Sequence, residues 1–151
     1  MTLLRQSLPL IILTLTAGSA SAATPAEIVR KWGLIGRWAI DCAVPVQRGA
    51  NNGVAYEITR EGRLIYRQDP ADRDRGYEVV EVTRGENNML ILRTEFPNFQ
   101  KTRENGIVLQ ADGTLRSIFN RDDAGNYTAR DGRFVASGRE TAGLHRCAGG
   151  N

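Results

Sequence analysis

The sequence predicts an all-β fold: a single antiparallel up-and-down barrel of about 8 to 10 strands with a short N-terminal helix, closed by one disulfide. Two observations carry this prediction. Short segments with alternating apolar and polar residues follow one another, separated by turn residues, as expected for strands with one buried and one wet face. The only two cysteines, Cys42 and Cys147, almost bracket these segments. Closure into a barrel removes the exposed edges of a sheet, and a β-sandwich is the alternative.

The N-terminus, residues 1–22, has the three parts of a secretory signal peptide. Arg5 stands before an apolar stretch from Leu8 to Leu15, and the small residues Ala20-Ser21-Ala22 precede the expected cleavage site. The apolar stretch is shorter than the roughly 20 residues that a helix needs to cross a bilayer. We therefore expect a periplasmic or extracellular protein with no stable membrane anchor, in which residues 23–151 form a single β-barrel domain.

Export favours a disulfide between Cys42 and Cys147, because an oxidising compartment allows the bond to persist. The first and last strands of an up-and-down barrel are neighbours, so cysteines at these two places can meet. The bond would close a loop of roughly 100 residues, which in the chain-entropy model stabilises a domain by about 4.7 kcal/mol. Two separate buried thiols are the alternative.

The segment Thr24-Pro25-Ala26-Glu27 has the form of a capping box, with proline at the first helical position. Ile28 and Trp32 then fall on one face, and Gly33 can adopt the left-handed conformation that ends a helix. A short helix is therefore expected to lie against a larger body.

Ten segments have the alternation of strands. Leu90, Leu92 and Phe96 share one face of their segment, and Leu115 and Phe119 repeat that pattern on another. The turn dipeptides Asp112-Gly113 and Asp131-Gly132 are each expected to link consecutive antiparallel strands. The expected strands lie near residues 37–42, 54–60, 63–68, 76–84, 88–96, 99–109, 114–120, 126–130, 133–138 and 142–147.

Gly36-Arg37-Trp38 opens the first expected strand. Through these residues the chain resembles the calycins, the group of lipocalins and avidin-like barrels, whose first strand carries Gly-x-Trp. The resemblance implies a basic residue from the final strand near the tryptophan ring, and Arg139 or Arg146 would take that place. An ordinary core tryptophan is the alternative.

The chain also resembles small uncharacterised exported proteins of alphaproteobacteria, and this likeness runs along the whole expected domain. It implies no activity, catalytic residue or ligand. The matching pieces are Lys31-Trp32-Gly33, Gly36-Arg37-Trp38-Ala39-Ile40-Asp41-Cys42, Arg130-Asp131-Gly132-Arg133-Phe134 and Arg146-Cys147.

Composition and motifs argue against several function classes. The net charge is only +3, with 20 basic and 17 acidic residues interleaved, which is too little for a nucleic-acid binder. His145 is the only histidine, and a metal site usually needs several ligands at suitable spacing. No Gly-x-Ser-x-Gly elbow occurs. We expect a protein that is not an enzyme, with no catalytic residue, metal or cofactor.

Phe99, Lys101 and Arg103 share one parity in a segment that otherwise loses its apolar alternation. If Phe99 faces the interior, the two cations face it too, and they would need carboxylate partners or an anionic ligand. The alternative is a bulge that shifts the parity and places both cations in water.

The function favoured by these observations is a non-enzymatic periplasmic barrel that binds a small apolar or amphiphilic ligand. The alternative is a packed interior, with the protein binding another protein through its surface, as a protease or lysozyme inhibitor does. An interior cavity of about 300 Å³ or more would favour the first. The candidate ligand-binding residues are Trp38, Tyr56, Leu90, Leu92, Lys101, Arg103 and Phe119.

Overall fold

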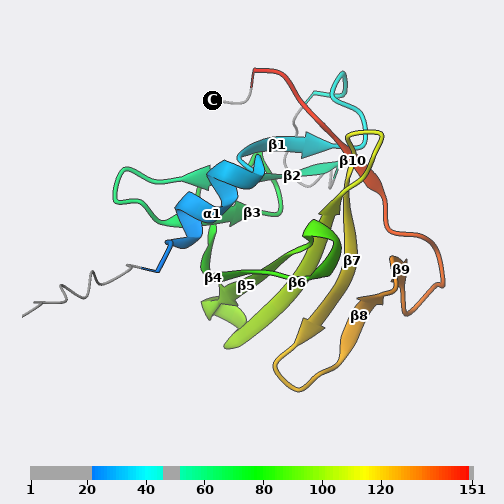
Figure 1. Ribbon diagram of the computed structural model, residues 1–151. Helices are drawn as coiled ribbons and strands as arrows, with labels where there is room; N and C mark the ends of the chain where they lie inside the picture. The colour runs from blue at the N-terminus through cyan, green and yellow to red at the C-terminus, as the bar shows by residue number, and fades with distance from the viewer. Residues whose placement is uncertain (1–21, 46–51, 150–151) are drawn as a thin grey trace, which may run out of the picture.

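The fold is a closed antiparallel β-barrel of eight strands with two further strands, one short helix and one disulfide. Figure 1 shows how the strands and the helix are arranged. The computed structural model describes residues 22–45 and 52–149, and the counts refer to these residues. The expected leader, apart from Ala22, and most of the loop near residues 47–53 lie outside them. The predicted fold class is confirmed, and a sandwich is not formed.

The strands of the ring follow one another in chain order until the last, which closes it. Strand β10 pairs with β1 on one side and with β7 on the other, so no edge remains between them. The ring strands are β1 (Gly36–Ala39), β2 (Gly53–Ile58), β3 (Leu64–Arg67), β4 (Tyr77–Arg84), β5 (Leu90–Phe96), β6 (Lys101–Leu109), β7 (Leu115–Asp122) and β10 (Gly143–Arg146).

Strand β7 has different partners at its two ends. Leu115 and Arg116 at its start pair with β10, whereas Asn120 and Arg121 near its end pair with β8 (Tyr127–Arg130). Strand β8 in turn pairs with β9 (Arg133–Phe134). Both extra strands therefore extend from β7 outside the ring, on the side away from the helix in Figure 1.

Most strands are slightly shorter than expected, and two of them end well before the residue that the alternation indicated. The first ends at Ala39, because the chain turns at Asp41, whose side chain accepts a hydrogen bond of 2.8 Å from the backbone N–H of Ala43. The strand expected at 133–138 ends at Phe134, where a tight turn begins with a hydrogen bond of 2.8 Å from the Phe134 N–H to the Arg139 carbonyl. Both predicted Asp-Gly turns are confirmed, with φ of 80° at Gly113 and 72° at Gly132.

The helix α1 (Pro25–Trp32) begins and ends as its sequence predicts. Thr24 accepts a hydrogen bond from the Glu27 N–H at 3.3 Å, and the Glu27 carboxylate accepts one from the Thr24 N–H at 2.7 Å. Gly33 ends the helix with a φ of 89°. The helix packs on β4, and the Trp32 indole donates to the Asn88 carbonyl at 2.8 Å. It therefore covers the end of the barrel where β4 returns as β5.

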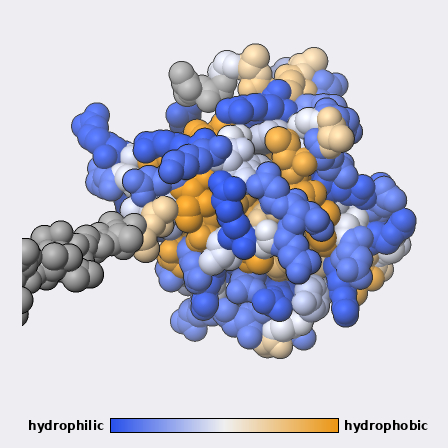
Figure 2. All heavy atoms as spheres, viewed as in Figure 1, coloured by the Kyte–Doolittle hydropathy of each residue, from blue (hydrophilic) through white to orange (hydrophobic). Residues whose placement is uncertain are grey.

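A hydrophobic core fills the part of the barrel nearest to this helix. Hydrophilic side chains form most of the face shown in Figure 2, with hydrophobic ones visible between them. Trp38 is 2% exposed in the core, and its indole donates to the Leu34 carbonyl at 2.8 Å. The core cluster comprises Val29, Trp32, Leu34, Trp38, Tyr56, Leu64, Val79, Val82, Leu90, Leu92, Ile107 and Leu115.

The seam between β1 and β10 joins the two ends of the described chain. Cys42 and Cys147 form the predicted disulfide, across a sequence separation of 105 residues. Beside it, the Arg146 guanidinium lies 5.8 Å from the centre of the Trp38 ring. Arg146 also donates to the carbonyls of Gly33 and Ile35, at 3.3 and 2.8 Å. One side chain thus ties the last strand to the chain between the helix and β1.

Candidate functional site

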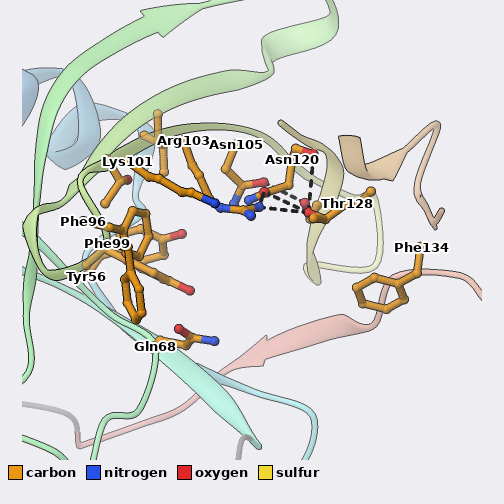
Figure 3. Close-up of a pocket in the computed structure, with 15 residues that line it drawn as sticks. Tyr56, Gln68, Phe96, Phe99, Lys101, Arg103, Asn105, Asn120, Thr128 and Phe134 are labelled. Atoms are coloured by element: carbon orange, nitrogen blue, oxygen red, sulfur yellow. Dashed lines mark hydrogen bonds between the residues drawn. The ribbon is translucent and has the colours of Figure 1, made fainter. Parts of the chain in front are cut away.

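A cavity of about 500 Å³ lies in the part of the barrel that the core leaves unfilled, and Figure 3 shows its walls. It is bounded by β2, β3 and β5 to β9 with their connections, so the two strands outside the ring form part of its wall. The lining residues are Tyr56, Tyr66, Gln68, Leu92, Thr94, Phe96, Phe99, Lys101, Arg103, Asn105, Ser117, Asn120, Thr128, Ala129 and Phe134.

One wall of the cavity comes from a row of aromatic rings, of which Tyr56, Tyr66 and Phe96 line the cavity. Tyr56, Tyr66 and Tyr77 are partners in the registers that join β2, β3 and β4. The ring centres of Tyr56 and Tyr66 are 5.4 Å apart, and those of Tyr66 and Tyr77 are 6.5 Å apart. Phe96 on β5 continues the row at 4.4 Å from Tyr77. The row thus crosses four neighbouring strands at distances at which aromatic rings attract one another.

Two tyrosines of this wall stay neutral at ordinary pH. Burial raises the pKa of Tyr66 to about 12, with a further contribution from Tyr77. Burial also raises the pKa of Tyr56, and Tyr66 adds to that effect. Each residue therefore gives the cavity an apolar ring and an uncharged phenol group.

The opposite wall is polar and comes mainly from β6. Lys101, Arg103 and Asn105 alternate on one face of this strand and line the cavity, as Figure 3 shows. The register of β5 with β6 runs without a shift from the pair Phe96 and Lys101 to the pair Leu90 and Ile107. The bulge that would have placed the two cations in water is therefore absent from this strand pair.

Hydrogen bonds hold the Arg103 side chain against two neighbouring strands. Its Nη1 donates to Asn120 Oδ1 on β7 at 2.7 Å and to Thr128 Oγ1 on β8 at 3.2 Å. The Thr128 hydroxyl donates to the same Asn120 oxygen at 3.0 Å, and Figure 3 shows all three bonds. Arg103 thus joins β6, β7 and β8, and its guanidinium orientation is fixed from one side.

The charge of Arg103 is not matched by an ion pair with any described residue. Asp122 lies opposite it in the register of β6 with β7. The Asp122 carboxylate instead accepts hydrogen bonds from the backbone N–H groups of Ala124 and Asn126, at 3.0 and 2.9 Å. Hydrogen bonds from Asn126, and to a smaller extent the charge of Arg103, lower the pKa of Asp122. The partners of the guanidinium are a neutral amide and a neutral hydroxyl.

Four of the seven candidate ligand-binding residues line the cavity, namely Tyr56, Leu92, Lys101 and Arg103. Trp38 and Leu90 do not line it, although both point inward, because they belong to the packed core on the side of the helix. Those two residues help to define where the cavity ends.

Phe119, the remaining candidate, does not line the cavity. Gly106 on β6 pairs with Phe119 and Ile107 pairs with Ser117, so Ile118 is an extra residue on β7. Such a bulge shifts the alternation by one position, and Asn120 rather than Phe119 lines the cavity.

On the other face of β7, the Phe119 ring lies against two neighbours. The Arg121 guanidinium lies 5.7 Å from its centre, and the Tyr127 ring meets it edge-on at 6.5 Å. Phe119 therefore takes part in the outer packing of the barrel wall.

Sequence reasoning missed lining residues for two different reasons. Asn105 and Tyr66 could have been predicted from the sequence, since Asn105 continues the parity of Arg103 and Tyr66 lies in the hairpin with Tyr56. Thr128 and Phe134 could not be predicted, because nothing in their sequence indicates that β8 and β9 leave the ring and fold beside its open end.

Other features of the described residues add no second site. His145 is exposed, and no group of three or more His, Cys, Asp or Glu residues is placed to hold a metal ion in the described part of the chain. Among the residues searched, none of the helices has the length and apolar character to span a membrane.

Comparison with known proteins adds no family assignment. No family model matches this chain, and neither a curated protein nor a solved structure matches it.

Proposed function

We propose that this protein is a non-enzymatic barrel that binds a small amphiphilic ligand in the open end of its interior. The observation that carries the proposal is the cavity of about 500 Å³, because ligand pockets usually measure about 300 to 1,000 Å³. Its two unlike walls fit a molecule with one apolar and one polar part. No specific observation favours the alternative of a protein-binding surface.

The apolar part of the ligand would lie against the aromatic wall, where Tyr66 and Phe96 are partly exposed. Phe99 and Phe134 flank the cavity from opposite sides in Figure 3. They are 64% and 46% exposed, and a ligand in the cavity would cover part of both rings.

Two further observations support the proposal. Arg146 lies over the Trp38 ring, where the calycin resemblance implied a basic residue. The disulfide suits an oxidising compartment, and it supports export of the mature chain to the periplasm or the extracellular space.

Binding of a neutral fluorescent probe tests the proposal. N-phenyl-1-naphthylamine emits strongly only in apolar surroundings, so it should show saturable fluorescence with the wild-type protein. Ser117→Phe places a ring in the cavity and should weaken probe binding at least about tenfold, which corresponds to about 1.4 kcal/mol.

Ser137→Phe is the matched control, because Ser137 is exposed in the turn after β9 and does not line the cavity. It should bind the probe as the wild type does. Absence of saturable binding to the wild type would refute the proposal, as would unchanged binding by a folded Ser117→Phe variant. Native mass spectrometry of the protein from its own host would then identify the molecule that it carries.

A further inference from the structure

Arg103 has a free side that fits a two-oxygen acceptor. Its hydrogen bonds to Asn120 and Thr128 both use Nη1. Its Nε and Nη2 make no hydrogen bond with any residue that the structure describes. The N–H groups of Nε and Nη2 are parallel donors, and their spacing matches the two oxygens of a carboxylate. Because Arg103 lines the cavity, this fork is available to a bound ligand.

The amides beside Arg103 also present donors. Asn105 Oδ1 accepts a hydrogen bond from the Ser117 hydroxyl at 2.7 Å. Asn120 Oδ1 already accepts two hydrogen bonds, from Arg103 and Thr128. The acceptor atoms of both amides are thus engaged within the protein, whereas their NH₂ groups have no partner among the described residues. This part of the wall offers N–H groups, so its natural partner is an acceptor.

The surrounding charges favour a single negative charge on that acceptor. Arg103 is the one cation fixed by hydrogen bonds among the described residues that line the cavity, since Lys101 is exposed at the rim. The carboxylate of Asp122 lies opposite Arg103 across the two strands and opposes the approach of a dianion. A guanidinium fork also matches a planar carboxylate directly.

We infer that the ligand is an amphiphilic carboxylate, with its head bound to Nε and Nη2 of Arg103 and its apolar tail against the tyrosines of the opposite wall. This inference rests on the proposed function and adds the chemical class and the orientation of the ligand. Asn105 and Asn120 donate to the remaining lone pairs of the head. Lys101 attracts the anion at the rim without fixing its geometry.

Competition against the neutral probe tests the head group with the tail held constant. Decanoate, decanol, decyl phosphate and decyltrimethylammonium share the same tail and differ in charge. Decanoate should displace N-phenyl-1-naphthylamine at about 10- to 100-fold lower concentration than decanol, because a charged hydrogen-bonded pair replaces a neutral one. Decyl phosphate should compete less well than decanoate, and the cation should be the weakest.

Substitution of Arg103 tests whether this residue causes the preference for decanoate over decanol. Arg103→Gln should lose the preference for decanoate over decanol, measured as the ratio of the concentrations at which the two compounds displace the probe from that variant. Arg103→Lys should also lose most of the preference, because an ammonium group keeps the charge but not the fork. Arg93→Gln is the control, since Arg93 lies exposed on the neighbouring strand β5 and does not line the cavity.

The outcomes separate this inference from the proposed function. Equal competition by decanoate and decanol in the wild type, or a preference for the phosphate or the cation, overturns the carboxylate assignment while the probe still binds. A preference that survives in Arg103→Gln overturns the role of Arg103. Failure of the probe and of every decyl compound to bind overturns the proposed function itself. The comparison in the wild type needs no variant, so it stands even if Arg103→Gln folds poorly.

Discussion

Tyr66 lies at the middle of the aromatic wall, between Tyr56 and Tyr77. Tyr66 lines the cavity, and burial raises its pKa to about 12. The neutral ring therefore persists over the whole physiological range, and an apolar tail can rest on it without displacing a charge.

The free energy of unfolding should fall as the pH rises from about 10 to about 12. The reference pKa of tyrosine is 10.0 and that of folded Tyr66 is about 12, so the unfolded chain loses this proton first. The contribution is complete below pH 10 and is lost as the pH rises through the folded pKa. Urea denaturation at several alkaline pH values measures the slope. Tyr66→Phe should give a flatter curve, and identical slopes would contradict the assignment.

The sequence predicts which way Arg103 faces, but not which residues it contacts. Its parity with Phe99 predicted that it would face the interior, and it does line the cavity. Its partners Asn120 and Thr128 could not be predicted, because the first depends on a bulge and the second on a strand outside the ring. Parity within one strand is local information, whereas the partners depend on how distant strands meet.

The bulge in β7 couples this strand to β6 through Gly106 and Phe119. A Cβ added at Gly106 would lie 2.2 Å from Cε1 and 2.5 Å from Cδ1 of the Phe119 ring. Glycine at this position thus lets the ring lie flat against β6, on the outside of the barrel. The bulge escaped prediction because Ile118 and Phe119 are adjacent apolar residues, and either of them could have been the one that faces inward.

Gly106→Ala should lower the free energy of unfolding by roughly 1–3 kcal/mol, because the Phe119 ring must move to admit the methyl group. In a Phe119→Ala background the ring is absent, and the cost of the same substitution should largely vanish. A double-mutant cycle by urea denaturation measures this coupling. Equal costs in the two backgrounds would show that the ring contact does not set the cost.

At the scale of the whole molecule, the disulfide fastens the barrel where its first and last strands meet. The cysteines predicted this seam, because strand order makes the two ends of an up-and-down barrel neighbours. The cavity could not be predicted in the same way. Its volume depends on how completely side chains such as Trp38 and Leu90 fill the interior, and strand alternation does not fix how far that filling extends.

Replacing Cys42 and Cys147 together with serine should lower the free energy of unfolding by up to about 4.7 kcal/mol, the chain-entropy value for a loop of about 100 residues. Probe affinity should stay the same under conditions where the variant is folded, because neither cysteine lines the cavity. Denaturant titration and probe fluorescence provide the two readouts. Changed affinity in a variant of full stability would mean that the seam shapes the binding site.

The two-sided pairing of β7 gives the molecule a modular design. The ring is complete with β10, so the hairpin of β8 and β9 can change in length or sequence without opening it. Thr128, Ala129 and Phe134 nevertheless come from that hairpin. Exchanging the segment for a different hairpin should therefore create barrels that fold alike and select different molecules, in the way that variable loops diversify antibodies on a constant scaffold.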